Sequence, residues 1–383
     1  MSVGLDETVI DLAKGQPTLS LLPLPALRAA ADHALAHGDA TLLQYGDDPG
    51  DARVRASLAG FLSRRYAAPV SAAELMMSAG VSQALDLVCT RFTRPGDTVF
   101  VEEPTYFLAL GIFRDHGLTV VGIPIDDEGL RVDALEAALA QHRPAFLYTI
   151  PAFQNPSGVT MSAARRQQLL AVSRAHDLLV VADDVYPLLD FGTAPPPVLA
   201  VHAEPARVLS LGSFSKICAP GLRLGWIHGA PALLNTLMHS GVVQSGGGLN
   251  PFAGGVVQPY IELGLADRVL DTLREVYANR AAALCDALRE QIPAATFDVP
   301  RGGYFVWVRL PGDVNAKSLA PFAAAEGVRY HAGTRFVRGH AFADHVRLSF
   351  ALYDIPELVE GVTRLSRAIT RAVAGVHDLP PAD

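Results

Sequence analysis

Cysteines, basic charge and long apolar runs are all scarce in this chain of 383 residues. The three cysteines, Cys89, Cys218 and Cys285, are odd in number and widely separated, which predicts neither a disulfide framework nor a zinc cluster and favours a reducing compartment, the cytoplasm. The formal net charge of −8 argues against nucleic acid and membranes as partners, because both attract basic surfaces. No run approaches the roughly 18 apolar residues that a membrane-spanning helix requires.

Two further features are missing. The opening residues MSVGLDETVI carry acids where a signal peptide would have a basic segment and a long apolar run, so no signal peptide is expected. The twelve histidines are scattered, and no metal site is expected. What the chain does have is apolar surface to bury: half of its residues are hydrophobic and 18% are charged. This composition predicts a globular enzyme, long enough for two or three domains.

Short apolar runs alternate with helical stretches between about residues 75 and 230. The helical spacing is clearest at 132–143 and 162–177. The apolar runs are four to eight residues long, are bounded by Pro, Gly or Asp, and lie at 97–103, 118–125, 145–151, 178–184 and 207–213. This alternation predicts an α/β fold with a mostly parallel sheet and helices on both of its faces.

The C-terminal part follows a different pattern. A long helical run at 266–292 leads to three segments that predict strands of a smaller sheet: TFDVPRGGYFVWVRL, GVRYHAGTRFV and HVRLSFAL. A last helix is expected after Pro356, and the final dozen residues are expected to be loose. We therefore expect a large domain at 45–285 and a small domain at 286–383, with the N-terminal segment 1–44 joining the small domain.

The segment GSFSKICAPGLRLGW, residues 212–226, is the most informative for chemistry. Burial of Lys216 after an apolar strand would lower the pKa of its amine, so that the neutral form attacks an aldehyde. Arg223 offers a planar fork suited to a phosphate dianion, and Ser213 and Ser215 add hydroxyl donors. Taken alone, the segment is equally consistent with a surface lysine and arginine in a loop.

The motifs SFSK and GLRLG resemble the lysine signature of the fold-type I aminotransferases, the class I/II enzymes that use pyridoxal 5′-phosphate. The resemblance runs from LAKGQP (12–17) to HVRLSF (345–350) and is greatest to the branch of kynurenine/2-aminoadipate aminotransferases and the effector domains of MocR-type regulators. It implies a large domain with a seven-stranded type of sheet, a small α+β domain, and a Schiff base between Lys216 and the cofactor.

The same resemblance assigns residues to the cofactor. The phosphate would lie on Val81 and Ser82, where a helix begins after Gly80, together with Ser213, Ser215 and Arg223. Tyr106, in EEPTY, would stack on the ring. At the end of an apolar strand, Asp183 would pair with the ring nitrogen, with Asp184 as the competing acid. Tyr186 and Asn155 would contact the phenolic oxygen, and a cis peptide is expected before Pro156.

Substrate and partner residues follow from the resemblance too. Arg347 would pair with the substrate α-carboxylate, Asn155 would assist it, and Gly15 would belong to a backbone segment that closes over the substrate. Tyr45 would reach the phosphate of a neighbouring subunit, which implies a homodimer. The apolar stretch 18–23 argues against a dedicated pocket for acidic side chains, unless Arg301 or Arg335 points inward.

Transfer of an amino group between an L-amino acid and a 2-oxo acid is the expected reaction, with Lys216 as the proton shuttle. A lyase or another reaction of the same cofactor is the alternative, because small changes in which bond is aligned choose among them. A sensor without turnover, like the regulators, is disfavoured: about ten residues precede LAKGQP, and the chain is acidic.

Overall fold

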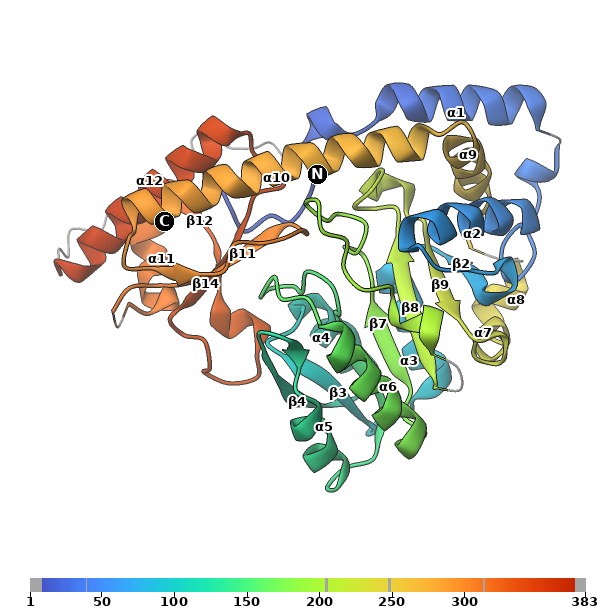
Figure 1. Ribbon diagram of the computed structural model, residues 1–383, viewed down its shortest axis with the longest axis horizontal. Coiled ribbons are helices and arrows are strands. Elements are labelled where there is room, and N and C mark those ends of the chain that lie inside the picture. Colours follow the sequence, from blue (N-terminus) through green and yellow to red (C-terminus); the bar gives the residue numbers. More distant parts are fainter. Residues whose placement is uncertain (1–8, 39, 204–205, 247–248, 313, 376–383) are drawn as a thin grey trace.

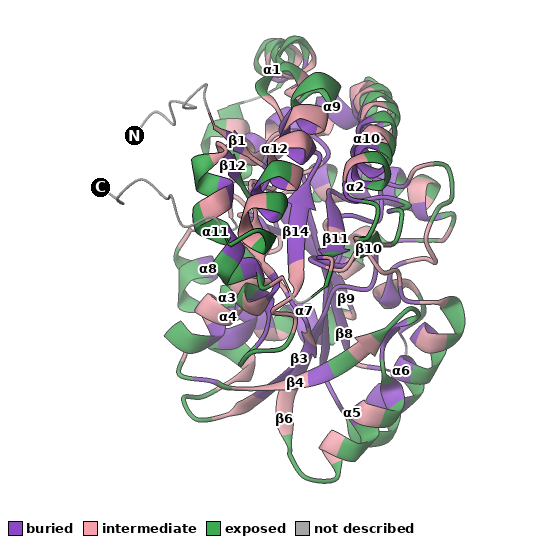
Figure 2. Cartoon of the chain, turned by 90° about the vertical axis from the view of Figure 1, so that its left-hand side faces the viewer, coloured by how far each residue is buried: buried purple, intermediate pink, exposed green. Residues whose placement is uncertain are grey.

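A large mixed sheet forms the centre of the computed structural model, which describes residues 9–38, 40–203, 206–246, 249–312 and 314–375. Its strand order is β2-β9-β8-β7-β6-β3-β4-β5. The strands are β2 (Leu75–Ser78), β3 (Thr98–Glu103), β4 (Thr119–Asp126), β5 (Gly129–Leu130), β6 (Pro144–Thr149), β7 (Val180–Asp183), β8 (Val208–Ser213) and β9 (Gly225–Gly229). Figure 2 shows β8 and β9 buried inside the molecule, whereas β4 near the edge of the sheet is largely intermediate or exposed.

The direction of the strands agrees with the expected fold class. Strands β4, β3, β6, β7 and β8 are neighbours and run parallel, and each overlaps one of the five apolar runs of the sequence. β9 is antiparallel to both β8 and β2. The two-residue β5 pairs antiparallel with β4 and adds an eighth strand to the seven longer ones. The predicted α/β architecture with a mostly parallel sheet is therefore confirmed.

Helices cover both faces of this sheet and extend beyond it (Figure 1). Those of the first 262 residues are α1 (Leu24–His37), α2 (Ala52–Tyr66), α3 (Val81–Phe92), α4 (Phe107–Asp115), α5 (Val132–Leu139), α6 (Ala163–His176), α7 (Pro231–Met238), α8 (Gly241–Gly246) and α9 (Pro251–Glu262). The others are α10 (Leu265–Gln291), α11 (Ala316–Ala325) and α12 (Ile355–Val373). Short 3-10 turns lie at η1 (Leu19–Leu21), η2 (Ala40–Leu43), η3 (Ala72–Glu74), η4 (Leu199–His202), η5 (Pro220–Leu222) and η6 (Gly333–Phe336).

Local sequence explains where these helices begin and end. α12 starts with a capping box between Asp354 and Glu357, and its apolar stripe is buried. α5 stops at Leu139, before the expected end at residue 143. The residue before a proline is disfavoured in the helical region, so the chain leaves the helix ahead of Pro144, where β6 begins.

A smaller antiparallel sheet lies beside the large one, with strand order β10-β11-β14-β13. Its strands are β10 (Thr296–Phe297), β11 (Phe305–Arg309), β14 (His345–Ser349) and β13 (His331–Ala332). In its register Arg347 of β14 pairs with Trp307 on one side and with His331 on the other. Arg347 therefore projects from the middle of a hydrogen-bonded sheet.

The N-terminal segment divides between the two parts. β1 (Ile10–Asp11) pairs in parallel with β12 (Val328–Arg329), which ties the start of the described chain to the C-terminal part. α1, in contrast, packs along α9. We propose that residues 1–44 and 286–383 form the small domain. Helix α10 runs unbroken through the expected boundary at 285. Of the final dozen residues, 372–375 complete α12 and its turn, and the others lie outside the described residues.

Helix α10 contacts both parts of the molecule along its length (Figure 1). Arg274 donates a hydrogen bond from Nε to the carbonyl of Leu188, in the segment after β7, at 2.8 Å. Two turns further on, Arg280 donates to the carbonyl of Ala351, after β14, at 2.9 Å. The helix thus links the chain after β7 to the chain after β14 through arginine side chains that donate to backbone carbonyls.

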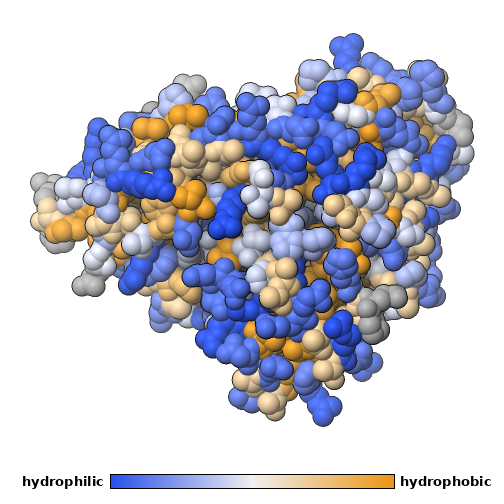
Figure 3. All heavy atoms as spheres, in the orientation of Figure 1, coloured by the Kyte–Doolittle hydropathy of each residue, from blue (hydrophilic) through white to orange (hydrophobic). Residues whose placement is uncertain are grey.

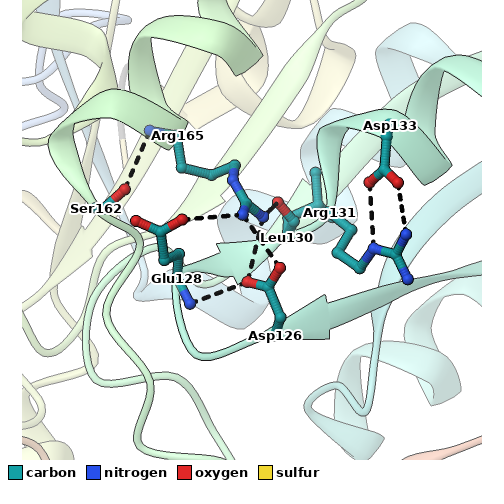
Figure 4. A network of polar contacts seen from close by, with 7 residues as sticks. All are labelled: Asp126, Glu128, Leu130, Arg131, Asp133, Ser162 and Arg165. Carbon is teal, nitrogen blue, oxygen red and sulfur yellow. Dashed lines mark hydrogen bonds and ion pairs between the residues drawn. The ribbon is translucent and has the colours of Figure 1, made fainter.

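Away from this junction, a polar network holds α6 against the hairpin formed by β4 and β5 (Figure 4). Arg165 donates to the carbonyl of Leu130 at 2.7 Å and pairs with Asp126 at 3.1 Å and Glu128 at 3.3 Å. Its own backbone N–H is capped by the Ser162 hydroxyl at 3.1 Å. These contacts stabilise the edge of the sheet.

Candidate active site

A cavity of about 400 Å³ lies where the parallel strands of the large sheet end and the small sheet begins. Ligands bind at this carboxyl edge in open α/β sheets. Its lining includes every site residue expected from the sequence except Tyr45: Gly15, Val81, Ser82, Tyr106, Asn155, Asp183, Tyr186, Ser213, Ser215, Lys216, Arg223 and Arg347. Residues more than 300 positions apart in the chain are therefore brought into one site.

Lys216 lies just beyond the end of β8 with its amine inside the cavity. Nζ donates to the carbonyl oxygen of Gly15 at 2.8 Å and lies 5.0 Å from the centre of the Tyr304 ring. The Tyr304 hydroxyl donates to the Lys216 carbonyl at 3.2 Å, which fixes the backbone of the lysine. Burial lowers the pKa of Lys216 to about 8, with the positive charge of Arg347 adding to the effect. The neutral amine is therefore a minor form at neutral pH but far more populated than for an exposed lysine.

Two adjacent acids end β7, and only Asp183 lines the cavity. Its Oδ2 accepts a hydrogen bond from the Tyr148 hydroxyl at 2.6 Å, while the buried Oδ1 has no partner among the described residues. Burial raises the pKa of Asp183 to about 7. The competing Asp184 does not line the cavity; burial raises its pKa to about 6 despite the opposing charge of Arg166.

The start of α3 and Arg223 form a cationic corner of the cavity. Val81 and Ser82 are the first residues of the helix, where backbone N–H groups have no partner within the helix. Gly80 precedes them at φ +90°, and a Cβ there would lie 3.0 Å from the Arg223 guanidinium. The helix start and this guanidinium are thus packed closely around a site for an anion.

Arg347 is 3% exposed and is held from three sides. Its guanidinium donates to Asn155 Oδ1 at 2.8 Å and to the Ala13 carbonyl at 2.7 Å, and it lies 3.9 Å from the centre of the Phe305 ring. Its Nε has no hydrogen-bond partner among the described residues. Burial lowers the pKa of Arg347 to about 10, which leaves it cationic at neutral pH. A buried cation with an unused donor suits a carboxylate ligand.

Two tyrosines and a cis peptide complete the expected set. Tyr106 immediately precedes α4, and burial raises the pKa of its phenol to about 12. Tyr186 is buried with its ring centre 5.6 Å from that of Tyr304. The peptide bond before Pro156 is cis, as predicted, and the bond before Pro104 is cis as well.

Glu102 is a buried residue of this region that sequence reasoning missed. It accepts hydrogen bonds from the Thr149 hydroxyl, from the backbone of Ile150 at 3.0 Å and from Gln154 Nε2 at 3.1 Å. Gln154 Nε2 also donates to the Pro104 carbonyl at 2.7 Å. Glu102 thereby joins the loop that carries Tyr106 to the loop that carries Asn155. In EEPTY, nothing distinguishes this acid from its half-buried neighbour Glu103.

Replacing Glu102 with glutamine is expected to lower the free energy of unfolding by about 1–3 kcal/mol, because an amide offers one acceptor oxygen and leaves buried donors unpaired. Thermal or urea unfolding of the cofactor-free protein measures the change. Glu103→Gln is the matched control, and a loss of similar size in both variants would contradict the role assigned to Glu102.

Three expected features lie outside the cavity. Tyr45 is 78% exposed and lines a second hollow of about 470 Å³, beside α1 and α9. Arg301 is exposed, and Arg335 lies with its guanidinium 4.2 Å from the centre of the Phe107 ring; neither lines the cavity. Neither guanidinium lines the cavity, although the charge of Arg335 contributes to lowering the pKa of the lining residues His331 and Arg347.

The histidines do not form a metal site among the described residues. His33 and His37 have the i, i+4 spacing of a helical metal pair, but their rings stack on each other with centres 4.4 Å apart. The described residues contain no group of three His, Cys, Asp or Glu side chains arranged to hold a metal ion. Within the same residues no helix is both long and apolar enough to cross a membrane.

Comparisons with known proteins agree with this geometry. The chain is 36% identical to aromatic-amino-acid aminotransferase 1 of Thermococcus litoralis, over 94% of this chain and 88% of that protein. It is 35% identical to 2-aminoadipate transaminase of Thermus thermophilus, over 96% and 91%. An uncharacterized HTH-type transcriptional regulator of Bacillus subtilis, YdfD, is 28% identical over 94% of this chain and 74% of its own length. The expected resemblance to both enzymes and regulators is confirmed.

One similar solved structure contains a form of the cofactor. Pyrococcus horikoshii kynurenine aminotransferase, in complex with PMP, superposes with a TM-score of 0.89 at 34% identity, covering 95% of this chain and 91% of that one. The sequence pattern of the family described as "Aminotransferase class I and II" matches residues 7–365. The protein therefore belongs to the class I and II aminotransferases, the fold-type I transaminases that depend on pyridoxal 5′-phosphate.

Proposed function

We propose that this aminotransferase moves an amino group between an L-amino acid and a 2-oxo acid in the cavity at the sheet edge, with Lys216 as its catalytic residue. One observation carries the proposal: Lys216, Asp183 and Arg347 line the same cavity. An amine, a carboxylate and a buried guanidinium are the groups needed to bind an aldehyde cofactor and an amino acid together.

The residues present fit pyridoxal phosphate. The unpartnered Oδ1 of Asp183 offers an acceptor for a protonated ring nitrogen, whose charge would favour the ionised carboxylate, and the start of α3 with Arg223 offers donors for the phosphate. The hydroxyls of Ser213 and Ser215, the ring of Tyr106 and the polar groups of Tyr186 and Asn155 line the space between. When bound, the cofactor supplies an aldehyde that takes up the amino group and a protonated ring that accepts the electron pair released at Cα.

The chain's own residues orient the substrate and move its proton. Arg347 binds the α-carboxylate and, with Asn155, fixes the orientation of the Cα–H bond. As a free amine, Lys216 Nζ would take the proton from Cα and carry it past the amino nitrogen to the aldehyde-derived carbon that the cofactor supplies. Asp183 would stabilise a positive charge on the ring nitrogen of the bound cofactor. The carbonyl of Gly15 holds the lysine amine beside this position.

Cofactor capture is expected to depend on pH through Lys216. The amine attacks a carbonyl carbon only when neutral, and its lowered pKa is about 8. Below that pH the ammonium form dominates and capture is slow; the rate of pyridoxal phosphate binding to the cofactor-free protein should rise as pH increases through about 8 and then level off. Stopped-flow absorbance measures it, and a flat profile across this range would count against the assignment.

Half-reactions with single amino acids test the proposed reaction. The yellow, cofactor-loaded enzyme is mixed with one amino donor at a time, beginning with aromatic amino acids and 2-aminoadipate, the substrates named for the two relatives. Conversion to the pyridoxamine form, reversed by 2-oxoglutarate or pyruvate, is the expected result. Release of ammonia without that form would instead indicate a lyase, and a spectral change without any product would indicate a sensor.

We also propose a homodimer in which Tyr45 reaches the neighbouring subunit's phosphate site. Large apolar side chains are exposed around it on α1, η2 and α9: Leu24 (74%), Leu35 (60%), Leu43 (74%) and Phe252 (47%). Figure 3 shows exposed hydrophobic residues among hydrophilic ones at this end of the molecule. Sedimentation of the native enzyme tests the dimer. The three buried, free cysteines support a cytoplasmic location, which cell fractionation tests.

A further inference from the structure

Lys14 lies in the backbone turn that covers the cavity. The residue before it, Ala13, accepts a hydrogen bond from Arg347 at 2.7 Å, and the residue after it, Gly15, accepts one from Lys216 at 2.8 Å. Lys14 also lines the cavity itself. Its position is thus fixed on both sides by the two cations between which a substrate would lie.

Among the described lining residues, Lys14 is the cation without an assigned ligand. Lys216, Arg223 and Arg347 are assigned to the aldehyde, the phosphate and the α-carboxylate. His331 lines the cavity too, but burial and the charge of Arg347 lower its pKa to about 3, so it is neutral. The Lys14 ammonium lies 3.8 Å from the Asp11 carboxylate, beyond hydrogen-bond distance, and its side chain is 32% exposed.

We propose that Lys14 is a specificity-determining residue that binds the side-chain carboxylate of dicarboxylic substrates; this inference rests on the proposed function. The turn that carries Lys14 contacts both Arg347 and Lys216, so a substrate held between these two cations would lie next to it. A charge-assisted hydrogen bond from the Lys14 ammonium would offset the free-energy cost of removing water from the side-chain carboxylate.

Asp11 gives the same lysine a second partner. When the substrate side chain is apolar, the Lys14 ammonium stays paired with the Asp11 carboxylate. No unpaired cation then lies beside the apolar group. Apolar side chains then meet Phe107 and Val185 in the cavity wall. The lysine therefore lets one cavity accept acidic and apolar side chains in turn.

Binding of two unreactive acids of equal length tests the inference without turnover. Glutarate carries two carboxylates and pentanoate carries one, and their dissociation constants are measured by calorimetry on the cofactor-loaded enzyme. The variants are Lys14→Met, which removes the charge, Lys14→Arg, which keeps it, and Lys317→Met on the exposed start of α11 as the control. The cofactor spectrum of each variant checks that the site is intact.

The native enzyme should bind glutarate more tightly than pentanoate. Lys14→Met should reduce that preference by about ten- to a hundredfold, the cost of one charge-assisted hydrogen bond, whereas Lys14→Arg and Lys317→Met should retain most of it. Equal binding of the two acids by the native enzyme, or an unchanged preference in Lys14→Met, would overturn the inference. Failure of every amino donor in the half-reaction would reject the proposed function instead, and the glutarate preference would still report on Lys14.

Discussion

Lys216→Ala is expected to leave a folded protein that no longer converts amino acids. The alanine has no amine to bond to the cofactor aldehyde or to take the proton from Cα. The half-reaction rate should fall by at least about 10²–10⁴-fold, the contribution typical of a positioned general base. The visible absorbance of the lysine-linked cofactor should be lost as well. Single-turnover absorbance with the best amino donor measures both effects.

The competing amine in this experiment is Lys14, which lines the same cavity. The chain contains three lysines, Lys14, Lys216 and Lys317, so borohydride reduction followed by peptide mass mapping identifies the bonded residue without ambiguity. The modification is expected on the peptide that contains Lys216. A modified Lys14, or native turnover in Lys216→Ala, would show that the assignment is wrong.

Asp183→Asn should produce the second large loss. The asparagine keeps the shape of the side chain but removes the negative charge from the unpartnered oxygen that faces the ring nitrogen. A loss of roughly 10²–10³-fold in the half-reaction is expected, as when one preorganised electrostatic partner is removed. Binding of ¹⁵N-labelled pyridoxal phosphate, followed by NMR, reports directly whether the ring nitrogen still carries its proton.

Two neighbouring variants serve as comparisons. Asp184→Asn changes an acid that does not line the cavity and should leave the ring nitrogen protonated. Tyr148→Phe removes the 2.6 Å hydrogen bond that stabilises the charged form of Asp183, so its effect should lie between those of the two aspartate variants. If Asp184→Asn removed the proton and Asp183→Asn did not, the roles of the two acids would have to be exchanged.

Part of this site was predictable because its residues lie at the ends of apolar runs that can be recognised in the sequence. The parallel strands are apolar runs with clear boundaries, and Lys216, Asp183 and Asn155 lie at or shortly after the ends of such runs. Where parallel strands end, their following residues meet at one edge of the sheet. The order of the runs predicts the sheet edge where ligands bind, whereas the resemblance to the aminotransferases assigns the individual residues to the cofactor and the substrate.

The residues that were missed depend on packing between distant segments. Tyr148 lies inside an apolar run, and only the neighbouring strand reveals that its hydroxyl meets Asp183. Glu102 and Glu103 are adjacent acids, and the sheet alone decides which one is buried. The place of Lys14 in the cavity was not predictable. It depends on the contacts of Ala13 and Gly15 with two cations that are distant in the sequence.

The long helix α10 has a consequence for how these distant segments keep their spacing. Arg274 and Arg280, six positions apart, are separated by about 9 Å along the axis of a stiff rod. Arg274 donates a hydrogen bond to the chain that follows Asp183, and Arg280 donates one to the chain that follows Arg347. Helix α10 therefore sets the spacing between the segments that carry Asp183 and Arg347. A rigid helix outside the cavity thus fixes the distance between the cofactor-binding and the carboxylate-binding sides of the site.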